Sequence, residues 1–369
     1  MAAEGGYDRV AFTTGAQNAK RFSLDQVLAE EIAYAPQGEG KYNIHAFDKF
    51  SGEEVLYEEN NLFKKLRLLV HAIMIRWKDL KIVNESDIVF IQREALMIGS
   101  TWFERKVKKS KAKFIFDFDD SIWILDTSEV NKKWEWLKNT GKTKKLIAMA
   151  DLVFAGNNYL ANYAFQFNKN VVTVPTTVDT AIFQPDFSKK KEDLVCIGWS
   201  GSHTTIKHFK SILPVLKKLK ERYLSKINFL VIGDVNFSDD ELGIKGNPWR
   251  KENEVDLLNT IDIGLMPLPN DQWSEGKCGL KGLTYMALEI PTVMSPVGVN
   301  KEIIRHRENG FLADTDDQWL ETLSELIEKP ELRREIGKKG RITVEEKYSV
   351  NANQNLYFQS LLNCLNQKH

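Results

Sequence analysis

One stretch, residues 262–300, constrains the fold of this chain more than any other. It opens with the apolar run Ile263 to Met266, which ends at Pro267 and is typical of a buried strand. A loop with two glycines follows, and from Leu280 onwards apolar residues recur at helical spacing. Pro291 to Ser295 is again typical of a strand. A strand, a loop, a helix and a second strand in this order predict one crossover unit of a parallel sheet.

Segments with strand and helix patterns alternate along the rest of the chain, which predicts parallel sheets with helices on both faces. The predicted strands are Arg9–Thr14, Tyr42–Phe47, Asp87–Ile91, Phe114–Phe118, Leu152–Ala155, Val171–Val174, Leu194–Trp199 and Asn228–Ile232. The predicted helices are Phe22–Ile32, Leu62–Leu80, Trp102–Val107, Lys132–Ala150 and Ile206–Lys220, with a turn at Pro36–Gly40. Thr315 and Gln318 are spaced as a capping box before a further helix. The predicted fold class is therefore α/β with doubly wound sheets.

The chain has 369 residues, which is enough for two domains. Residues 176–191 have no periodicity and become rich in lysine, as expected of a hinge. We therefore expect a first Rossmann-like domain over residues 1–180 and a second over residues 181–345, which face each other across a cleft. Residues 346–369 are predicted to form a terminal helix, because apolar spacing continues through Gln354–Ser360, a segment similar to a protease-tag scar.

The composition excludes several classes of protein. Lys plus Arg and Asp plus Glu number 51 each, which argues against a dedicated nucleic-acid binder but allows a local basic patch. The three cysteines are too few and too scattered for a disulfide framework or a zinc site. The first residues lack the apolar core of a signal peptide, and no apolar run reaches the length of a membrane span. We expect a cytoplasmic protein in a reducing environment.

The loop Glu275–Gly279 is a predicted phosphate site, because it contains glycines and opens a helix. The first N–H groups of a helix have no acceptor within the helix, and the helix dipole favours negative charge there. Lys277 and Lys281 add formal positive charge at the same place. The alternative is an ordinary crossover with solvated lysines.

A second glycine-containing turn, Ile197–Ser202, also joins a strand to a helix. Ser202 or Thr204 is the expected N-cap, and Lys207 lies one turn further on. Two helix starts that converge on one anion are suited to gripping a nucleotide diphosphate. Gly233 ends another strand and is expected either to line the pocket for the base or to form a plain turn.

The stretch analysed first resembles the donor-binding segment of glycosyltransferase family 4, the retaining enzymes of GT-B fold, and the resemblance continues more weakly over the rest of the chain. The matching residues are Glu275, Gly276, Gly279, Leu280, Met286, Ala287, Pro291, Val293 and Gly298. Thr284 departs from the family pattern, which has a glutamate there to hold the nucleotide ribose. Glu289 stands where the family usually has glycine. We expect Glu302, just beyond the loop at Gly298, to supply the missing acceptor.

The resemblance implies a GT-B architecture, with the donor in the second domain, the acceptor in the first and the terminal helix crossing back to the first. The residues expected to bind the donor are Gly201, Ser202, His203, Gly233, Lys277, Cys278, Gly279, Leu280, Thr284 and Glu302. Lys281 and Lys207 are expected to stabilise the leaving diphosphate, and Glu275 to hold sugar hydroxyls. No cofactor is expected, since the nucleotide-diphosphate sugar is the substrate.

Two sets of polar residues follow strands of the first domain. Asp117, Asp119 and Asp120 have a spacing that can hold Mg²⁺ or Mn²⁺. We prefer the interpretation without metal, in which Asp119 and Asp120 lie at the rim of the cleft and contact acceptor hydroxyls; helix capping is the alternative. Gln92 and Arg93 are expected to contact the acceptor, or else to form a surface salt bridge.

Residues 60–113 carry a local excess of positive charge, with 13 Lys and Arg against 5 Asp and Glu. The helix in this region mixes basic residues with apolar ones: Lys64, Lys65, Arg67, Arg76, Lys78 and Lys81 among Leu66, Leu69, Ile73, Met74 and Trp77. Such a face can rest on anionic lipid, with about 1 kcal/mol for each basic residue near the surface. A solvated face is the alternative.

These features together predict a metal-independent retaining hexosyltransferase. It would move a sugar from a nucleotide-diphosphate donor to a hydroxyl of a glycan or lipid-linked acceptor, in cell-surface polysaccharide or glycolipid synthesis, with no role for nucleic acid. Two alternatives stay open: a non-catalytic protein that binds a nucleotide sugar, which Thr284 favours, and a nucleotide-sugar epimerase of the same fold.

Overall fold

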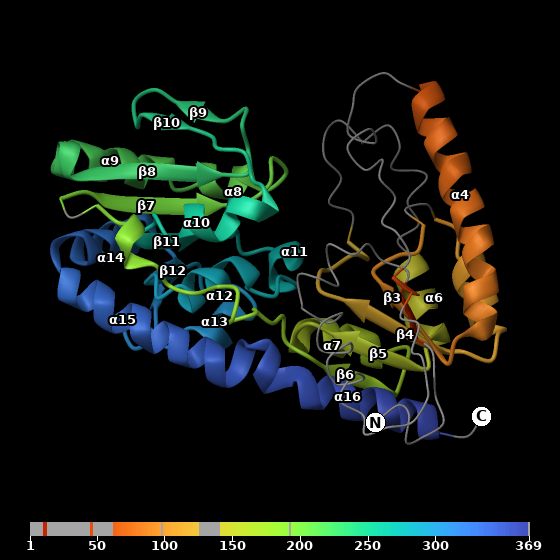
Figure 1. Cartoon of the computed structure of the whole chain (residues 1–369). Helices are drawn as coiled ribbons and strands as arrows, with labels where there is room; N and C mark the ends of the chain where they lie inside the picture. The colour runs from red at the N-terminus through yellow and green to blue at the C-terminus, as the bar shows by residue number, and fades with distance from the viewer. Residues whose placement is uncertain are drawn as a thin grey trace. The chain divides into compact units, whose positions relative to one another are not determined.

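A computed structural model describes residues 10–12, 45–46, 62–96, 99–124, 141–191 and 193–367. The predicted helix Phe22–Ile32 and the turn Pro36–Gly40 lie outside the described residues. The chain divides into two compact units, Met1–Pro175 with Gln354–His369, and Thr176–Asn353 (Figure 1). The divisions fall at 175/176 and 353/354, where the sequence analysis expected 180/181 and 345/346.

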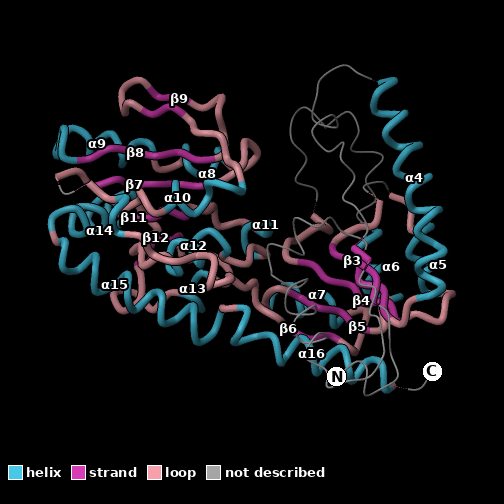
Figure 2. Tube along the Cα trace, viewed as in Figure 1, coloured by secondary structure: helices cyan, strands magenta, loops and turns pink. Residues whose placement is uncertain are grey.

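The first unit contains a six-stranded sheet in which every pair of neighbours is parallel, in the order β2-β1-β3-β4-β5-β6. Figure 2 labels β3 to β6 of this sheet. Its strands are β1 (Val10–Phe12), β2 (His45–Ala46), β3 (Ile88–Gln92), β4 (Lys113–Phe118), β5 (Leu152–Ala155) and β6 (Val171–Thr173). Its helices are α4 (Leu62–Glu85), α5 (Trp102–Lys108), α6 (Gly141–Met149) and α7 (Asn158–Phe165), together with most of α16 (Val350–Asn366). Helix α7 was not predicted from the sequence.

The terminal helix α16 packs on one face of this sheet. Ile88 and Phe90 of β3 share a buried cluster with Phe358 and Leu361 of α16. The Tyr357 ring lies 4.5 Å, between centroids, from that of Phe154. The segment that is similar to a protease-tag scar is therefore part of the core of the first unit, and the predicted return of the terminal helix to the first domain is confirmed.

The second unit contains a five-stranded parallel sheet in the order β13-β12-β11-β7-β8. Its strands are β7 (Val195–Ser200), β8 (Ile227–Ile232), β11 (Ile263–Met266), β12 (Thr292–Met294) and β13 (Phe311–Leu312). Its helices are α8 (Ile206–Lys210), α9 (Leu213–Tyr223), α10 (Glu254–Leu258), α11 (Gln272–Glu275), α12 (Leu280–Ala287), α13 (Asn300–Ile303), α14 (Asp316–Glu328) and α15 (Pro330–Thr343). A small antiparallel hairpin, β9 (Ser238–Asp239) and β10 (Ile244–Lys245), was not predicted from the sequence.

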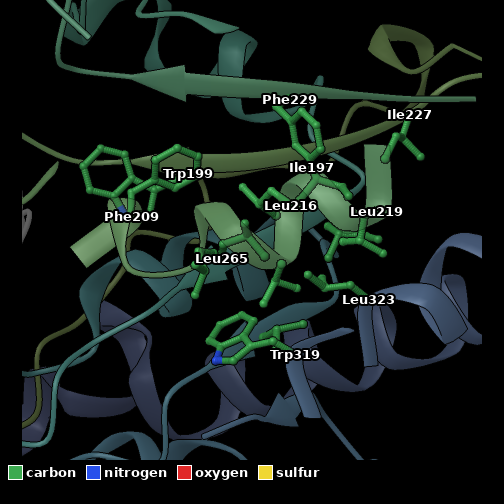
Figure 3. Packing of buried hydrophobic residues seen from close by; sticks show 14 of the residues in the cluster. Ile197, Trp199, Phe209, Leu216, Leu219, Ile227, Phe229, Leu265, Trp319 and Leu323 are labelled. Atoms are coloured by element: carbon green, nitrogen blue, oxygen red, sulfur yellow. The ribbon is translucent and has the colours of Figure 1, made fainter. Parts of the chain in front are cut away.

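Both faces of this second sheet are buried. Successive side chains of a strand point to opposite faces, and here neighbouring residues of one strand belong to two different buried clusters. Ile197 and Trp199 of β7 pack in the cluster that contains Leu216 of α9 and Trp319 of α14 (Figure 3). Cys196, next to Ile197 in the same strand, belongs instead to the cluster on the other face, with residues of α10 and α12. Fully burying one large apolar side chain contributes about 1.5–3 kcal/mol, so this double layer holds the loops at the strand ends in place.

Two local predictions can be compared directly with the structure. The single helix predicted over Ile206–Lys220 is wrong, because the chain breaks between Lys210 and Leu213 into α8 and α9. Pro214 lies in the first turn of α9, where a proline fits, and its ring would clash with the preceding turn of a continuous helix. The capping box of Thr315 and Gln318 is confirmed at the start of α14.

Candidate functional site

The order of the second sheet defines where a ligand is expected. Strands β7 and β11 are neighbours, yet the chain runs from β7 outwards to β8 in one direction and from β11 to β12 and β13 in the other. Ligands of doubly wound sheets bind beyond the carboxyl ends of the strands at such a switch point. The loops that follow these two strands are residues 201–205, which overlap the predicted turn Ile197–Ser202, and residues 267–279, which contain the predicted phosphate loop Glu275–Gly279.

Lys281, in the first turn of α12, connects these two loops. Its Nζ lies 4.4 Å from the centroid of the Trp199 ring and 3.4 Å from Oγ1 of Thr205. A Cβ atom on Gly201 would lie only 2.5 Å from the same Nζ. A side chain at residue 201 would therefore have to displace the Lys281 ammonium group and the Trp199 ring. An ammonium group above an aromatic face is attracted to the ring, so Trp199 helps to fix it there.

Gly201 and Gly233 let the loops after β7 and β8 approach each other closely. The N–H of Gly201 donates to the carbonyl of Ile232 at 2.9 Å. Gly233 has a φ of +108°, and a Cβ on it would lie 2.0 Å from the carbonyl oxygen of Gly201. No residue with a side chain fits this contact without a shift of the backbone, so both predicted donor glycines have a structural requirement that brings them together.

The start of α12 is built from a second pair of glycines. Gly279, with a φ of +73°, is the N-cap of α12. Gly298 has a φ of +52°, and a Cβ on it would lie 2.7 Å from the carbonyl oxygen of Glu275. Asn300 is fully buried beside them: its Oδ1 would lie 3.5 Å from a Cβ on Gly279 and has no hydrogen-bond partner among the described residues. The loops after β11 and β12 thus meet at the helix start where an anion is predicted to bind.

Tyr285 anchors α12 to the end of β7. Its hydroxyl accepts a hydrogen bond from the N–H of Ser200 at 2.7 Å, and its ring lies where a side chain on Gly264 would collide with it. Burial raises the pKa of the Tyr285 hydroxyl well above its ordinary value, so the group stays neutral. This contact fixes Lys281, one turn earlier in the helix, relative to the first loop.

His208 reports the electrostatic potential of this region. Burial lowers its pKa, and the charges of Lys281, Lys207 and Lys277 lower it further, to about 4. The three lysines that the sequence analysis predicted for phosphate binding therefore act on one buried imidazole. Lys277 also lies 5.1 Å from the centroid of the Trp273 ring. A positive potential of this kind favours a bound anion.

The remaining predicted donor residues differ in their environments. Thr284 is buried, and its hydroxyl donates to the carbonyl of Lys281 at 2.7 Å. Glu302 is exposed on α13. Burial raises the pKa of Tyr348, and the negative charge of Glu302 raises it further. Cys278 is buried with its Sγ 3.8 Å from the carbonyl of Gly276.

Three further donor candidates, Leu280, Ser202 and His203, have no contact among the described residues that can be compared with the predicted donor binding. Leu280 packs against the apolar cluster of α12 and α13. Ser202 and His203 lie exposed in the turn after β7, where the Ser202 hydroxyl is 2.9 Å from that of Thr204. Neither Ser202 nor Thr204 is the N-cap of α8, since that position belongs to Thr205.

The predicted acceptor residues of the first unit come together at the ends of β3 and β4. Arg93 has a φ of +61°, which is unusual for a residue with a side chain and stores strain. Its N–H donates to the carbonyl of Asp117 at 2.8 Å. Its guanidinium pairs with Asp120 at 2.8 Å and lies 3.8 Å from Oδ1 of Asp119. The predicted surface salt bridge of Arg93 is therefore present, and it lies at the predicted acceptor position.

Asp117 of β4, whose carbonyl accepts from Arg93, is half-buried. Burial and then the neighbouring Asp119 raise the pKa of Asp117, while a hydrogen bond with Gln92 opposes the change. Burial raises the pKa of Tyr357 as well, and the charges of Asp117 and Asp119 add to it. The terminal helix thus contributes a hydroxyl group to this end of the first sheet. Among the described residues, no group of three or more His, Cys, Asp and Glu side chains is arranged to hold a metal ion.

Sequence reasoning missed the residues that complete these sites. Trp199, Thr205 and His208 contact or report on the lysines, and Asn300 lies at the start of α12. Trp199 lies near the end of β7, Thr205 and His208 come within eight residues after that strand, and Asn300 comes six residues after β12. This position after a strand is the signal that was available. Tyr357 gave no such signal, because only the packing of α16 brings it to the first sheet.

Comparison with protein families gives a match over residues 179–343 to the family described as glycosyl transferases group 1. Among curated proteins, the N-acetyl-alpha-D-glucosaminyl L-malate synthase of Bacillus anthracis is 23% identical over 253 residues. The match covers 60% of this chain and 63% of that protein, so it spans less than two thirds of the relative.

Solved structures resemble the chain over nearly its whole length. A glycosyltransferase from Rickettsia africae is 14% identical with a TM-score of 0.63, covering 98% of this chain and 99% of that one. Sucrose-phosphate synthase from Thermosynechococcus elongatus is 13% identical with a TM-score of 0.69, covering 96% and 98%. Anabaena Alr3699/HepE, solved in complex with UDP and glucose, is 11% identical with a TM-score of 0.65, covering 97% and 100%. The predicted GT-B fold of two Rossmann-like domains is confirmed.

Proposed function

We propose that this chain, whose residues 179–343 belong to the glycosyl transferases group 1 family, transfers a sugar from a nucleotide-diphosphate donor to a hydroxyl group of an acceptor. The observation that carries the proposal is Lys281, which crosses Gly201 at the switch point of the second sheet and begins the helix of the family motif. The positive potential that Lys281, Lys207 and Lys277 exert on His208 supports an anion site at the same loops.

The chemistry follows from where negative charge develops. As the bond between the sugar and the diphosphate breaks, the leaving phosphate gains charge, and the first N–H groups of α12 with Lys281 and Lys207 stabilise it. Glu275, whose backbone carbonyl lies close to Gly298, would accept hydrogen bonds from sugar hydroxyls with its carboxylate. Resemblance to the family favours retention of configuration by attack on the same face, which needs no nucleophile from the protein.

A uridine-diphosphate hexose is the donor class that the relatives favour. One relative is solved with UDP-glucose, and the curated relative is named for an N-acetylglucosaminyl product. The acceptor is a hydroxyl compound, which Asp119 and Asp120 at the end of β4 would contact. Cell-surface polysaccharide or glycolipid synthesis is the proposed context.

The test is turnover with a panel of nucleotide-diphosphate sugars, measured as free nucleotide with and without an acceptor mixture in excess EDTA. Acceptor-dependent release of one nucleotide is expected. Release without any acceptor would support simple hydrolysis, and binding without release would favour the non-catalytic alternative. A complete loss in EDTA that Mn²⁺ or Mg²⁺ restores would contradict metal independence.

We also propose peripheral contact with the cytoplasmic face of a membrane through α4. Val70, Ile73, Met74 and Trp77 are 48%, 37%, 49% and 69% exposed, and their spacing places them on one stripe of the helix. Exposed basic residues, Arg67, Lys78 and Lys81, lie on the same helix. Arg76 does not add to that surface, because it is buried and paired with Asp79 at 2.7 Å. Among the described residues, no helix combines the length and the apolar character that a membrane span requires.

Sedimentation with vesicles tests this contact. Wild-type protein should pellet with vesicles that contain phosphatidylglycerol and stay in solution with phosphatidylcholine vesicles. Replacing Met74 and Trp77 with Ser should abolish pelleting, while Val235→Ser, at a site that is also exposed but lies on the second unit, should not. Equal pelleting of all variants would contradict the proposal.

A further inference from the structure

The first unit also contains a pocket of about 340 Å³. Its lining comes from the residues before α5, one side of α5, and one residue of α6: Gly99, Ser100, Thr101, Trp102, Arg105, Lys106, Lys109 and Lys145. Half of the lining residues are cations and none is acidic. A pocket with this composition favours an anionic ligand.

The cations converge because of the helical repeat. Arg105, Lys106 and Lys109 lie on the exposed side of α5, whereas Phe103 and Val107 face the core. Lys145 of α6 completes the set from the neighbouring helix. None of these four basic side chains pairs with a carboxylate among the described residues. Like charges held together repel each other, so a bound anion would relieve a cost that the empty pocket carries.

The frame of the pocket is held by buried polar contacts on the other side of α5. Glu104 is completely buried and accepts a hydrogen bond from the N–H of Ala95 at 3.3 Å. Lys142 of α6 lies 3.7 Å from Glu104, 2.9 Å from Glu94, and donates to the carbonyl of Leu96 at 2.6 Å. These contacts join α5, α6 and the segment after β3, so the relative positions of the basic residues are fixed before a ligand arrives.

The pocket also offers neutral hydrogen-bond donors. Thr101 is buried and is the N-cap of α5 but makes no capping hydrogen bond with its side chain. The Ser100 hydroxyl oxygen accepts a hydrogen bond from the N–H of Trp102 at 3.2 Å. The hydrogen of the same hydroxyl group can still be donated to a ligand. Hydroxyl groups beside an Arg fork and ammonium groups match the oxygen atoms of a phosphate.

We propose that this pocket binds a phosphoryl group, carried either by a soluble phosphate ester or by a lipid headgroup. Every residue that lines the pocket belongs to the first unit, whereas the predicted donor loops belong to the second unit. The pocket does not depend on the proposed transferase activity and can be tested by binding alone.

The experiment titrates glycerol 3-phosphate into the full chain by calorimetry and, in parallel, measures pelleting with phosphatidic acid vesicles against phosphatidylcholine vesicles. All proteins in the pelleting assay carry Met74→Ser and Trp77→Ser, so that α4 does not contribute to pelleting. The test variant is Arg105→Ala with Lys109→Ala, and the matched control is Lys144→Ala, an exposed lysine next to Lys145 that does not line the pocket. Lys281→Ala reports phosphate that binds at the donor loops instead. UDP binding, which should be unchanged in the pocket variant, shows that the chain is folded.

The pocket variant should weaken binding at least about tenfold, because two charged contacts are lost, while Lys144→Ala should have little effect. Loss of glycerol 3-phosphate binding would identify a soluble ligand, and loss of pelleting alone would identify a headgroup; either outcome supports the pocket. The proposal is overturned if both probes bind the pocket variant normally, if Lys144→Ala weakens binding equally, or if Lys281→Ala alone removes it.

Discussion

The polar residues at the carboxyl ends of the two sheets use charge in opposite ways. In the second unit, Lys281 contacts an aromatic ring and a hydroxyl, and the lysines around it lower the pKa of buried His208. In the first unit, Arg93 pairs with Asp120, and burial together with Asp119 raises the pKa of Asp117. The lysines give the second unit a positive potential at this edge of its sheet, whereas the same edge of the first unit carries a group of carboxylates.

This difference assigns different chemistry to the two regions. A positive potential next to glycines and the start of a helix favours a diphosphate, which is negatively charged and whose oxygen atoms accept hydrogen bonds from backbone N–H groups. Carboxylates that are already paired, such as Asp120, suit a neutral hydroxyl compound, since they accept hydrogen bonds without requiring a charged ligand. The proposed anion site of the second unit and the proposed hydroxyl site of the first unit would therefore both rest on a parallel sheet of the same type.

The largest expected effect tests the paired charges of the first unit. Lys142→Met should lower the free energy of unfolding by about 3–5 kcal/mol, because it leaves the buried carboxylate of Glu104 without its cation. Urea unfolding measures it, and Lys144→Met on the exposed side of the same helix is the control. The double variant Glu104→Gln with Lys142→Met should recover part of the loss. An unchanged unfolding midpoint would show that the network is not a structural element.

Lys281→Ala tests the second unit. Turnover should fall about 10²–10³-fold, equivalent to about 2–4 kcal/mol, because one charged contact to the leaving phosphate is lost. The urea midpoint should hardly change, since Lys281 is only partly buried. The control is Lys218→Ala, an exposed lysine on α9. Near-normal turnover would mean that the phosphate assignment is wrong and that the contrast between the two units has another cause.

The position of the ribose acceptor gives a smaller effect. Glu302→Ala should weaken UDP binding by about 1.5–3 kcal/mol if Glu302 replaces the family glutamate. Thr284→Glu should give no gain, because position 284 is buried and its hydroxyl already bonds to the carbonyl of Lys281. Calorimetry on the three proteins decides the point. A large gain from Thr284→Glu with no effect at Glu302 would favour the non-catalytic alternative.

His208 provides a pH-dependent test of the positive potential. Its pKa of about 4 lies below the ordinary value of 6.5, so the folded state prefers the neutral imidazole. This contribution to stability is complete above pH 6.5 and is lost as the pH falls through about 4. Binding of UDP should raise the His208 pKa, because the diphosphate offsets the lysine charges. An NMR titration of the imidazole with and without UDP measures the shift, with His306 as the reference; an unchanged value would place the anion elsewhere.

Local patterns predicted the strands of both sheets well, because both faces are buried and the strands are short apolar runs. Ile263–Met266 and Leu152–Ala155 were predicted with the boundaries that the structure gives. The break between α8 and α9 was missed, since apolar spacing continues across it and only Pro214 signals a new start. The glycines of the predicted donor loops could be identified from the sequence, because a glycine in a turn between a strand and a helix is recognised from the residues next to it.

The partners of those glycines could not be predicted in the same way. Tyr285 reaches Ser200, and Tyr357 reaches the sheet of the first unit, only after distant segments have packed. Buried charges such as Glu104 and Lys142 are also invisible to composition, because each looks like an ordinary surface residue until its partner is known. The sequence therefore predicts the loops that hold a ligand more readily than the side chains that position those loops.

The smallest expected effect concerns Glu289, where the related family usually has glycine. The residue follows α12 with a φ of +54°, and the backbone cannot relax easily because a Cβ on Gly337 of α15 would lie 2.1 Å from its carbonyl oxygen. A left-handed residue after a helix favours glycine, since any Cβ is strained there by about 1–2 kcal/mol. Glu289→Gly should raise the free energy of unfolding by about 0.5–1 kcal/mol, because the relief exceeds the entropy that glycine gains in the unfolded chain. Glu289→Ala removes the same carboxylate but keeps the Cβ, so it should give no gain. Equal urea midpoints for the two variants would show that the carboxylate, and not the backbone, determines the energy at the end of the donor helix.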